Sequence, residues 1–222
     1  MPAPTAFLVT PPTREPRASP LARFLCAHGA GAGMETPFLT AMAQLLAGRG
    51  IATHRFEFAY MGARRTSSAR RPPPRAERLI HEFLTAVAHM PTGTPLLIGG
   101  KSMGGRVASL VAEELYQQGR IGGLVCLGYP FHPPKEPDRL RTRHLLELAC
   151  PALIVQGERD PFGTRAEVEA LSLSDAILVH WAIDGDHDLS PRAASGFTRK
   201  DNLTAAADAV ASFAASSARA RR

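Results

Sequence analysis

The 222-residue chain predicts an α/β fold, with a mainly parallel sheet of six to seven strands, helices on both faces and no large cap domain. Short apolar runs alternate with longer amphipathic runs, which is typical of strand–helix–strand crossovers. Only about twenty residues separate the apolar runs at 122–127 and 152–155, too few for a large cap. The length suits one domain, 1–222, and we find no internal linker or repeat.

The N-terminal third predicts an edge segment and two central strands. Residues 1–20 are the edge segment, in which 7–10 can add an antiparallel strand. The apolar runs at 23–28 and 51–58 are the central strands. Between them, Thr36 suits an N-cap and Pro37 the first position of a helix, whose apolar residues recur at helical spacing.

The segment 61–74 is polar and rich in arginine and proline, and we expect a long loop there, with a lid or a substrate loop as its candidate roles. The rest of the chain continues the alternation, and its final residues, 215–222, are small, polar and basic and are expected to fray. The predicted helices cover 75–90, 105–118, 138–148, 165–171 and 201–214, and the predicted strands cover 95–98, 122–127, 152–155 and 176–183.

Charge and composition limit the classes of partner. The net charge is +6, and 23 of the 26 basic residues are arginines, which cluster at 64–78 and 139–143. These clusters are open to two interpretations, a patch for nucleic acid or acidic substrates and ordinary solvated faces. No nucleic-acid-binding motif accompanies the charge, so we expect no nucleic-acid partner.

Location is predicted from apolar runs and cysteines. No run is long enough to span a membrane, and residues 1–20 lack the apolar centre of a secretory signal. Cys26 and Cys126 lie in apolar strand-like runs, which favours buried free thiols and a cytoplasmic protein. A catalytic cysteine is a weak alternative, because none lies in a turn with a base nearby in sequence.

The most informative stretch is Gly100-Lys-Ser102-Met-Gly104, a G-x-S-x-G sequence between an apolar run and an amphipathic run. In this setting the sequence indicates a nucleophile elbow, a strained turn that exposes the serine oxygen. Lys101 is expected to be a turn residue with its charge in solvent.

Two further loops supply partners for this serine. Asp160 follows the predicted strand 152–155, and His187 follows the last strand. The carboxyl ends of parallel strands share one edge, so Ser102, Asp160 and His187 can meet there as nucleophile, orienting acid and general base. Asp184 and Asp186 are rival acids, but they lie too near His187 in sequence to orient its ring easily.

An oxyanion site and an acyl pocket complete the predicted site. The Met103 amide follows the nucleophile, and the second donor is expected from the glycine-rich loop after the first central strand, with Ala30 first and Gly29 second. Arg64 and Arg65, on the long loop, could select acidic substrates. The residues expected to line the acyl pocket, each equally plausible as packing beneath it, are Met34, Tyr60, Met61, Tyr129 and Phe131.

Two phosphate-binding motifs fail on spacing. A P-loop ending at Lys101-Ser102 needs glycine at position 95, where Pro95 stands. A dinucleotide fingerprint starting at Gly29 needs glycine at position 34, where Met34 stands. We therefore expect no cofactor, and the scattered histidines predict no metal site.

These motifs resemble the α/β-hydrolase superfamily, and more narrowly its small capless branch related to dienelactone hydrolases. The segments that carry the resemblance are His-Gly-Ala-Gly-Ala-Gly, Gly-Lys-Ser102-Met-Gly-Gly, Tyr129-Pro-Phe-His-Pro, Gly-Glu-Arg-Asp160-Pro-Phe-Gly and Gly-Asp-His187, within 22–214. That branch includes bacterial predicted hydrolases, an animal testis-expressed protein and a subunit of a nuclear acetyltransferase-associated complex. The resemblance implies a triad of Ser102, Asp160 and His187.

The predicted function is hydrolysis of a carboxylic ester, thioester or amide of a small-molecule acyl substrate through an acyl-enzyme on Ser102. The absence of a cap favours an open, shallow site over one for long acyl chains. The alternative is a non-catalytic scaffold or interaction module that keeps the fold, although a scaffold has no need of all three triad residues.

Overall fold

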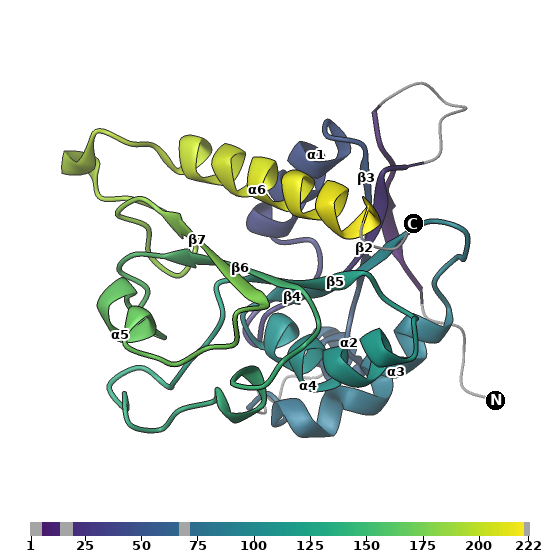
Figure 1. Ribbon diagram of the computed structural model, residues 1–222, viewed down its shortest axis with the longest axis horizontal. Helices are drawn as coiled ribbons and strands as arrows, with labels where there is room; N and C mark the ends of the chain where they lie inside the picture. Colours follow the sequence, from purple (N-terminus) through teal and green to yellow (C-terminus); the bar gives the residue numbers. More distant parts are fainter. Residues whose placement is uncertain (1–5, 14–19, 67–71, 220–222) are drawn as a thin grey trace.

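The computed structural model describes residues 6–13, 20–66 and 72–219, which form a seven-stranded sheet with helices on both faces (Figure 1). The strand order is β1-β3-β2-β4-β5-β6-β7. Six strands are parallel, and β1 pairs antiparallel with β3 at one edge, as predicted. The strands are β1 (Leu8–Thr10), β2 (Ala22–Ala27), β3 (Ile51–Phe56), β4 (Leu96–Lys101), β5 (Gly123–Leu127), β6 (Ala152–Gly157) and β7 (Ile177–Ala182).

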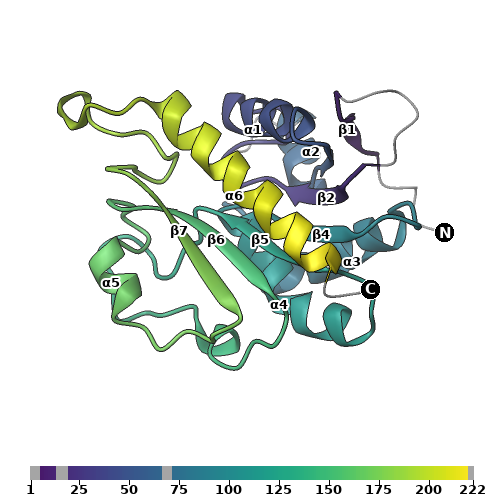
Figure 2. The ribbon, with the colours of Figure 1, turned by 45° about the horizontal axis from the view of Figure 1, so that its top comes forward.

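The helices divide into two layers. Helices α1 and α6 pack against each other on one face, and α3 and α4 cover the other, as Figures 1 and 2 show. Each layer buries its own apolar cluster against the sheet, which explains why β3 and β5 are buried along their whole length. The helices are α1 (Pro37–Ala47), α2 (Ala59–Thr66), α3 (Ile80–Ala88), α4 (Met103–Gln117), α5 (Arg165–Glu169) and α6 (Arg199–Arg219).

Two predicted elements differ in type from those observed. The predicted loop 61–74 begins as helix α2, and residues 67–71 lie outside the described residues. The predicted helix 138–148 is irregular, with only a short 3-10 turn at Arg143–Leu145. Residues 128–151, between β5 and β6, therefore contain no α-helix and no cap domain.

The C-terminal tail is also more ordered than predicted. Helix α6 continues to Arg219, because Phe213, Ala214 and Ser217 are buried against the rest of the molecule. Within 215–222, residues 215–219 are thus helical rather than frayed, and 220–222 lie outside the described residues. In the part of the chain that is described, no helix is long and apolar enough to cross a membrane.

Candidate active site

Ser102 occupies a sharp turn between β4 and α4. Its backbone angles are φ 51° and ψ −115°, a conformation that costs a non-glycine residue about 1–3 kcal/mol. The flanking glycines make the turn possible. A Cβ at Gly100 would lie 2.2 Å from the carbonyl oxygen of Ala27, and one at Gly104 would lie 2.6 Å from the same oxygen. The G-x-S-x-G sequence therefore forms the strained strand-to-helix turn that it predicts.

Asp160 and His187 lie together at the carboxyl edge of the sheet. The Oδ2 atom of Asp160 accepts a 2.7 Å hydrogen bond from Nδ1 of His187. Asp160 is fully buried, and its Oδ1 atom accepts a 2.9 Å hydrogen bond from the amide of Phe162. A buried carboxylate that accepts from Nδ1 fixes the imidazole as the Nδ1–H tautomer, which leaves the Nε2 lone pair available as a base.

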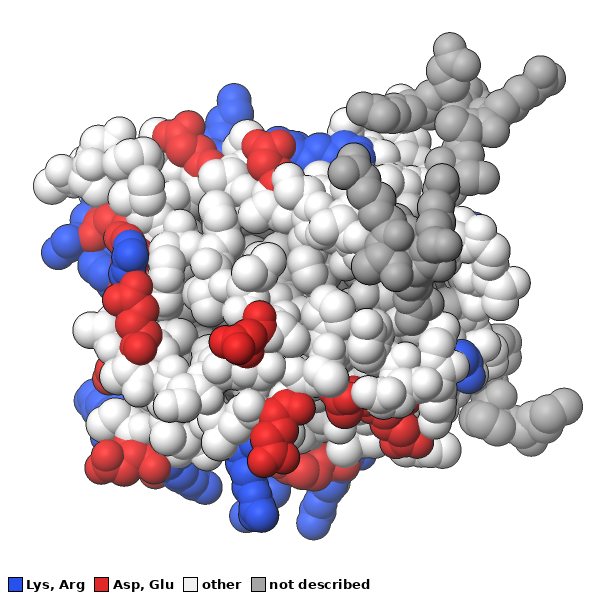
Figure 3. Space-filling model, in the orientation of Figure 1, with Lys and Arg blue, Asp and Glu red and all other residues white. Residues whose placement is uncertain are grey.

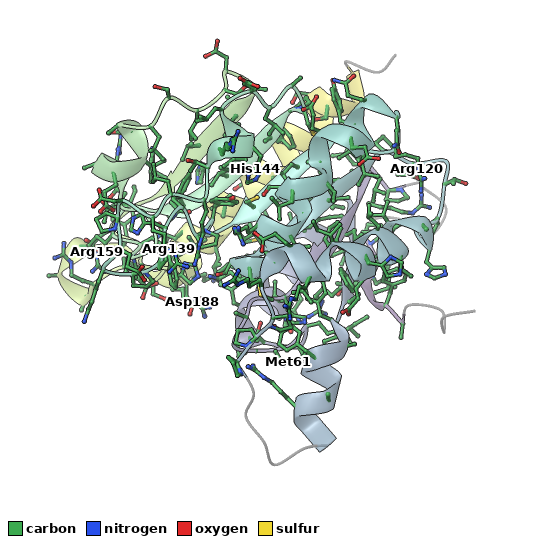
Figure 4. The ribbon with its side chains drawn as sticks, turned by 90° about the horizontal axis from the view of Figure 1, so that it is seen from below. Met61, Arg120, Arg139, His144, Arg159 and Asp188 are labelled. Carbon is green, nitrogen blue, oxygen red and sulfur yellow. The ribbon has the colours of Figure 1, made fainter. Side chains whose placement is uncertain are left out.

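The loops that carry Asp160 and His187 lie at the same edge of the sheet, which can be followed in Figure 4. Asp188, which follows His187 on the loop after β7, and Arg159, on the loop after β6, lie on one side of the molecule. Arg120, which precedes β5, lies on the opposite side. The topology thus gathers the loops that carry Asp160 and His187 at one rim, as parallel strands require.

Ser102 and His187 line the same cavity, which has a volume of about 630 Å³. Its wall also includes Ala30, Phe38 and Arg199. Within the described residues, no hydrogen bond joins the Ser102 hydroxyl to His187. Such bonds are often long before substrate binds and tighten in the substrate complex.

Phe162 and Gln156 support this pair and were not singled out from the sequence. The Phe162 ring lies 4.5 Å from the His187 ring, centroid to centroid, and limits its rotation. Gln156 is fully buried, and its Nε2 atom donates a 3.1 Å hydrogen bond to Oδ2 of Asp160. Nothing in the apolar run 152–155 indicated that Gln156, the residue after it, would donate a hydrogen bond to Asp160.

The predicted oxyanion donors flank Ser102. The Met103 amide is at the N-terminus of α4, where amides have no acceptor within the helix. A Cβ at Gly29 would lie 3.7 Å from Cβ of Ser102, which puts the glycine-rich loop beside Ser102. In the described part of the chain, neither the Met103 nor the Ala30 amide donates to another protein group. Both are therefore free to donate to a substrate oxygen.

His28 sets the shape of that glycine-rich loop. Its Nε2 atom accepts a 3.1 Å hydrogen bond from the amide of Phe58, so its proton is on Nδ1. Nδ1 donates to the carbonyl oxygen of Gly29 over 2.7 Å. Burial lowers the pKa of His28, which keeps the ring neutral. The hydroxyl of Tyr60 donates to the carbonyl oxygen of Ala30 over 3.1 Å and holds the next peptide.

Lys101 lies inside the molecule, and the expectation that its charge is in solvent is wrong. The residue is 7% exposed, and its Nζ atom donates a 2.8 Å hydrogen bond to the carbonyl oxygen of His187. Nζ also lies 3.4 Å from Oδ1 of Asp188. Burial lowers the pKa of Lys101, and the carboxylates of Asp188 and Asp160 oppose that shift.

The rival acids shape the histidine loop without contacting the His187 ring. Asp184 pairs with Nε of Arg159 at 2.9 Å and with Arg192. Oδ1 of Asp186 accepts hydrogen bonds from the amides of Asp188 and Ser190. Asp160 is therefore the carboxylate that contacts the imidazole.

The five residues predicted to line the acyl pocket lie elsewhere than in the cavity shared by Ser102 and His187. Tyr129 and Phe131 are fully buried in the core, and Met61 is 7% exposed. Met34 and Tyr60 hold neighbouring loops through hydrogen bonds of their backbone and hydroxyl groups. Apolar character alone did not distinguish residues of a cavity wall from those packed beneath it.

A second cavity, of about 500 Å³, borders the other side of Ser102. It shares Ala30, Ser102 and Phe162 with the first cavity. Its wall also includes Met103 and residues of the second arginine cluster, among them Arg139 and Arg141. Ser102 thus lies at the boundary between the two cavities.

On the face seen in Figure 3, basic and acidic side chains are interspersed around the rim. Arg64 donates to the carbonyl oxygen of Ala30 over 3.1 Å and lies over the Tyr60 ring. Arg64 therefore supports the glycine-rich loop. The side chain of Arg65 lies outside the described residues.

The cysteines are buried free thiols, as predicted for Cys26 and Cys126. Burial raises the pKa of Cys26 to about 12 and raises that of Cys126 as well. Neither thiol forms a thiolate near neutral pH, which argues against a cysteine nucleophile. Among the described residues, no group of three or more His, Cys, Asp or Glu side chains could hold a metal ion.

Solved structures with the same fold cover nearly the whole chain. A dienelactone hydrolase from Anabaena variabilis is 20% identical, with a TM-score of 0.67 over 92% of this chain and 88% of that chain. An α/β serine hydrolase without a lid from Xanthomonas campestris is 18% identical, with a TM-score of 0.66 over 96% of both chains. The esterase domain of a Rhodothermus marinus protein is 16% identical, with a TM-score of 0.65 over 96% of this chain and 92% of that chain.

Residues 20–215 match the family described as alpha/beta hydrolase domain. The match includes the elbow, the acid and the histidine, and extends from before β2 into the last turns of α6. On this match and on the fold, the chain belongs to the α/β-hydrolase family.

Proposed function

We propose that the protein is a serine hydrolase that cleaves a carboxylic ester, thioester or amide of a small acyl substrate through an acyl-enzyme on Ser102. The observation that carries the proposal is the 2.7 Å hydrogen bond between His187 and the buried Asp160, beside a cavity that Ser102 also lines. The hydrolase and esterase neighbours support the same reaction class.

In this reaction the Ser102 oxygen attacks the acyl carbon while Nε2 of His187 takes its proton. Asp160 stabilises the resulting imidazolium through Nδ1. The amides of Met103 and Ala30 donate to the negative oxygen of the tetrahedral intermediate, and each such donor is worth about 3–4 kcal/mol. His187 then gives its proton to the leaving group, and later activates the water that releases the acid.

Hydrolysis of p-nitrophenyl acetate and butyrate tests this proposal. We expect Ser102→Ala to lower kcat by about 10⁴-fold or more, and Asp160→Asn by about 10⁴-fold. Asp175→Asn is the matched control, because Asp175 is an exposed carboxylate of the same type. Circular dichroism checks that each variant is folded.

The outcome also separates the hydrolase from a scaffold with the same fold. A hydrolase loses turnover in Ser102→Ala and Asp160→Asn but keeps it in Asp175→Asn. A folded wild-type protein that cleaves neither ester, nor any member of a broader panel of short acyl esters, thioesters and amides, would contradict the proposal.

A further inference from the structure

The second cavity beside Ser102 has a strongly basic wall. Among the described residues, four arginines line it, Arg75, Arg106, Arg139 and Arg141, and Glu77 is the only carboxylate that does so. Arg139, on the loop after β5, lies on the same side of the molecule as Asp188 in Figure 4. The arginines come from three separate segments of the chain, and the fold brings their positive charges together around one cavity.

Carboxylates of the protein neutralise only part of this charge. Arg106 pairs with Glu77 at 2.6 Å, and Arg139 pairs with the exposed Glu136 at 3.1 Å. Within the described residues, Arg75 and Arg141 take part in no ion pair, and the buried Nε atom of Arg106 has no hydrogen-bond partner. The wall therefore has unused guanidinium donors.

Arg141 is the most constrained of the four. It is partly buried. Its backbone amide donates a 2.7 Å hydrogen bond to the carbonyl oxygen of Phe131, and its carbonyl oxygen accepts a 2.9 Å hydrogen bond from the hydroxyl of Tyr129. Burial lowers the pKa of Arg141, and the neighbouring charges of Arg106 and Arg139 lower it further. A partly buried cation held beside two others is stabilised by an anion that enters the cavity.

The position of His187 assigns a side of the substrate to each cavity. His187 lines the first cavity and is not among the residues of the second. A general base that later protonates the leaving group must lie beside it, so the leaving group belongs in the first cavity. The acyl chain then extends from Ser102 into the second cavity.

We propose that the arginine-lined cavity binds a carboxylate at the far end of the acyl group, so that the preferred substrates are half-esters or half-thioesters of short dicarboxylic acids. The inference rests on the proposed function, because the two sides of the substrate are defined by attack of Ser102. Guanidinium groups recognise carboxylates through paired, charge-assisted hydrogen bonds.

Matched esters test the charge and its position. p-Nitrophenyl hydrogen glutarate and p-nitrophenyl valerate have acyl chains of equal carbon number and differ by the terminal carboxylate. We expect kcat/KM to favour the glutarate ester by at least about tenfold. Moving the carboxylate to the leaving group, in 3-carboxyphenyl valerate compared with phenyl valerate, is expected to give no such preference.

Variants locate the recognition. Arg141→Gln is expected to lower the glutarate-to-valerate ratio of kcat/KM at least about tenfold. Arg143→Gln is the matched control, because Arg143 is an exposed arginine two residues away that does not line the cavity. An equal ratio in the two variants, or a wild-type enzyme that favours valerate, would overturn the inference.

A binding measurement distinguishes failure of this inference from failure of the proposed function. Glutarate is titrated calorimetrically into Ser102→Ala and into the double variant Ser102→Ala/Arg141→Gln. Binding that weakens at least about tenfold in the double variant supports the subsite even if no ester is cleaved. If Ser102→Ala does not bind glutarate and wild-type enzyme hydrolyses both esters equally, the subsite is absent while the hydrolase stands.

Discussion

Lys101 holds the loop that carries His187, the proposed general base: its Nζ atom donates a 2.8 Å hydrogen bond to the carbonyl oxygen of His187. Lys101 directly precedes Ser102 in the chain, so the residue that holds the His187 loop is bonded to the proposed nucleophile. A Cβ at Gly128 would lie 3.2 Å from Nζ of Lys101 and 3.3 Å from Cε1 of His187, so Gly128 leaves room for both groups.

Replacing Lys101 by methionine keeps the apolar stem and removes the donor. We expect kcat to fall by up to about 10²-fold with little change in KM, because a base displaced by about 1 Å acts poorly. Stability is expected to change little, because a buried charge is removed and its partner Asp188 is exposed. Steady-state kinetics and urea unfolding of the same variant check both. A large loss of stability with unchanged kcat would contradict the positioning role.

The close approach of α4 to β2 predicts a large difference between two glycines. A Cβ at Gly104 would lie 2.6 Å from the carbonyl oxygens of Ala27 and His28, whereas one at Gly31 would meet no atom within 4 Å. We expect Gly104→Ala to lower the free energy of unfolding by about 1–3 kcal/mol, and Gly31→Ala to leave it nearly unchanged. Urea denaturation measures both variants, and equal values would show that the turn tolerates a side chain.

His144 predicts a loss of stability in acid. Burial, with a further contribution from Arg106, lowers the pKa of this ring to about 4 from 6.5. The unfolded chain therefore binds more protons than the folded protein between about pH 6.5 and 4, so stability falls as the pH falls through that window. The contribution is up to about 2 kcal/mol, since partial exposure screens the charge.

Urea unfolding at several pH values between 6.5 and 4 measures this contribution. His28, His54 and His180 also have lowered pKa values and change stability in the same direction, so the comparison is with His144→Gln. The variant is expected to lose less stability on acidification than wild type. Identical slopes in the two proteins would show that His144 is not responsible.

The sequence predicted the sheet and the sharp turn at Ser102 because both depend on local signals. Strand-like runs alternate with helical ones, and G-x-S-x-G has glycines where a Cβ would lie within 3 Å of backbone atoms. The acid and the histidine each follow a strand, so the parallel topology alone brings them to one edge.

The errors arose where distant contacts override local sequence. Helix α2 begins at Ala59, whose amide donates a 2.7 Å hydrogen bond to the carboxylate of Glu82 on α3. The predicted helix 138–148 is held irregular by contacts of Arg141 with Tyr129 and Phe131. The burial of Lys101 likewise depends on His187, 86 residues away. Local periodicity contains none of these relationships.

The most direct test of the account is covalent labelling of the wild-type protein with a fluorophosphonate, followed by mass spectrometry of the intact chain and its peptides. We predict one adduct, on Ser102, that is absent in Ser102→Ala and forms at least about 10²-fold more slowly in His187→Ala. No adduct on the folded wild-type protein, or an adduct on another residue, would contradict it.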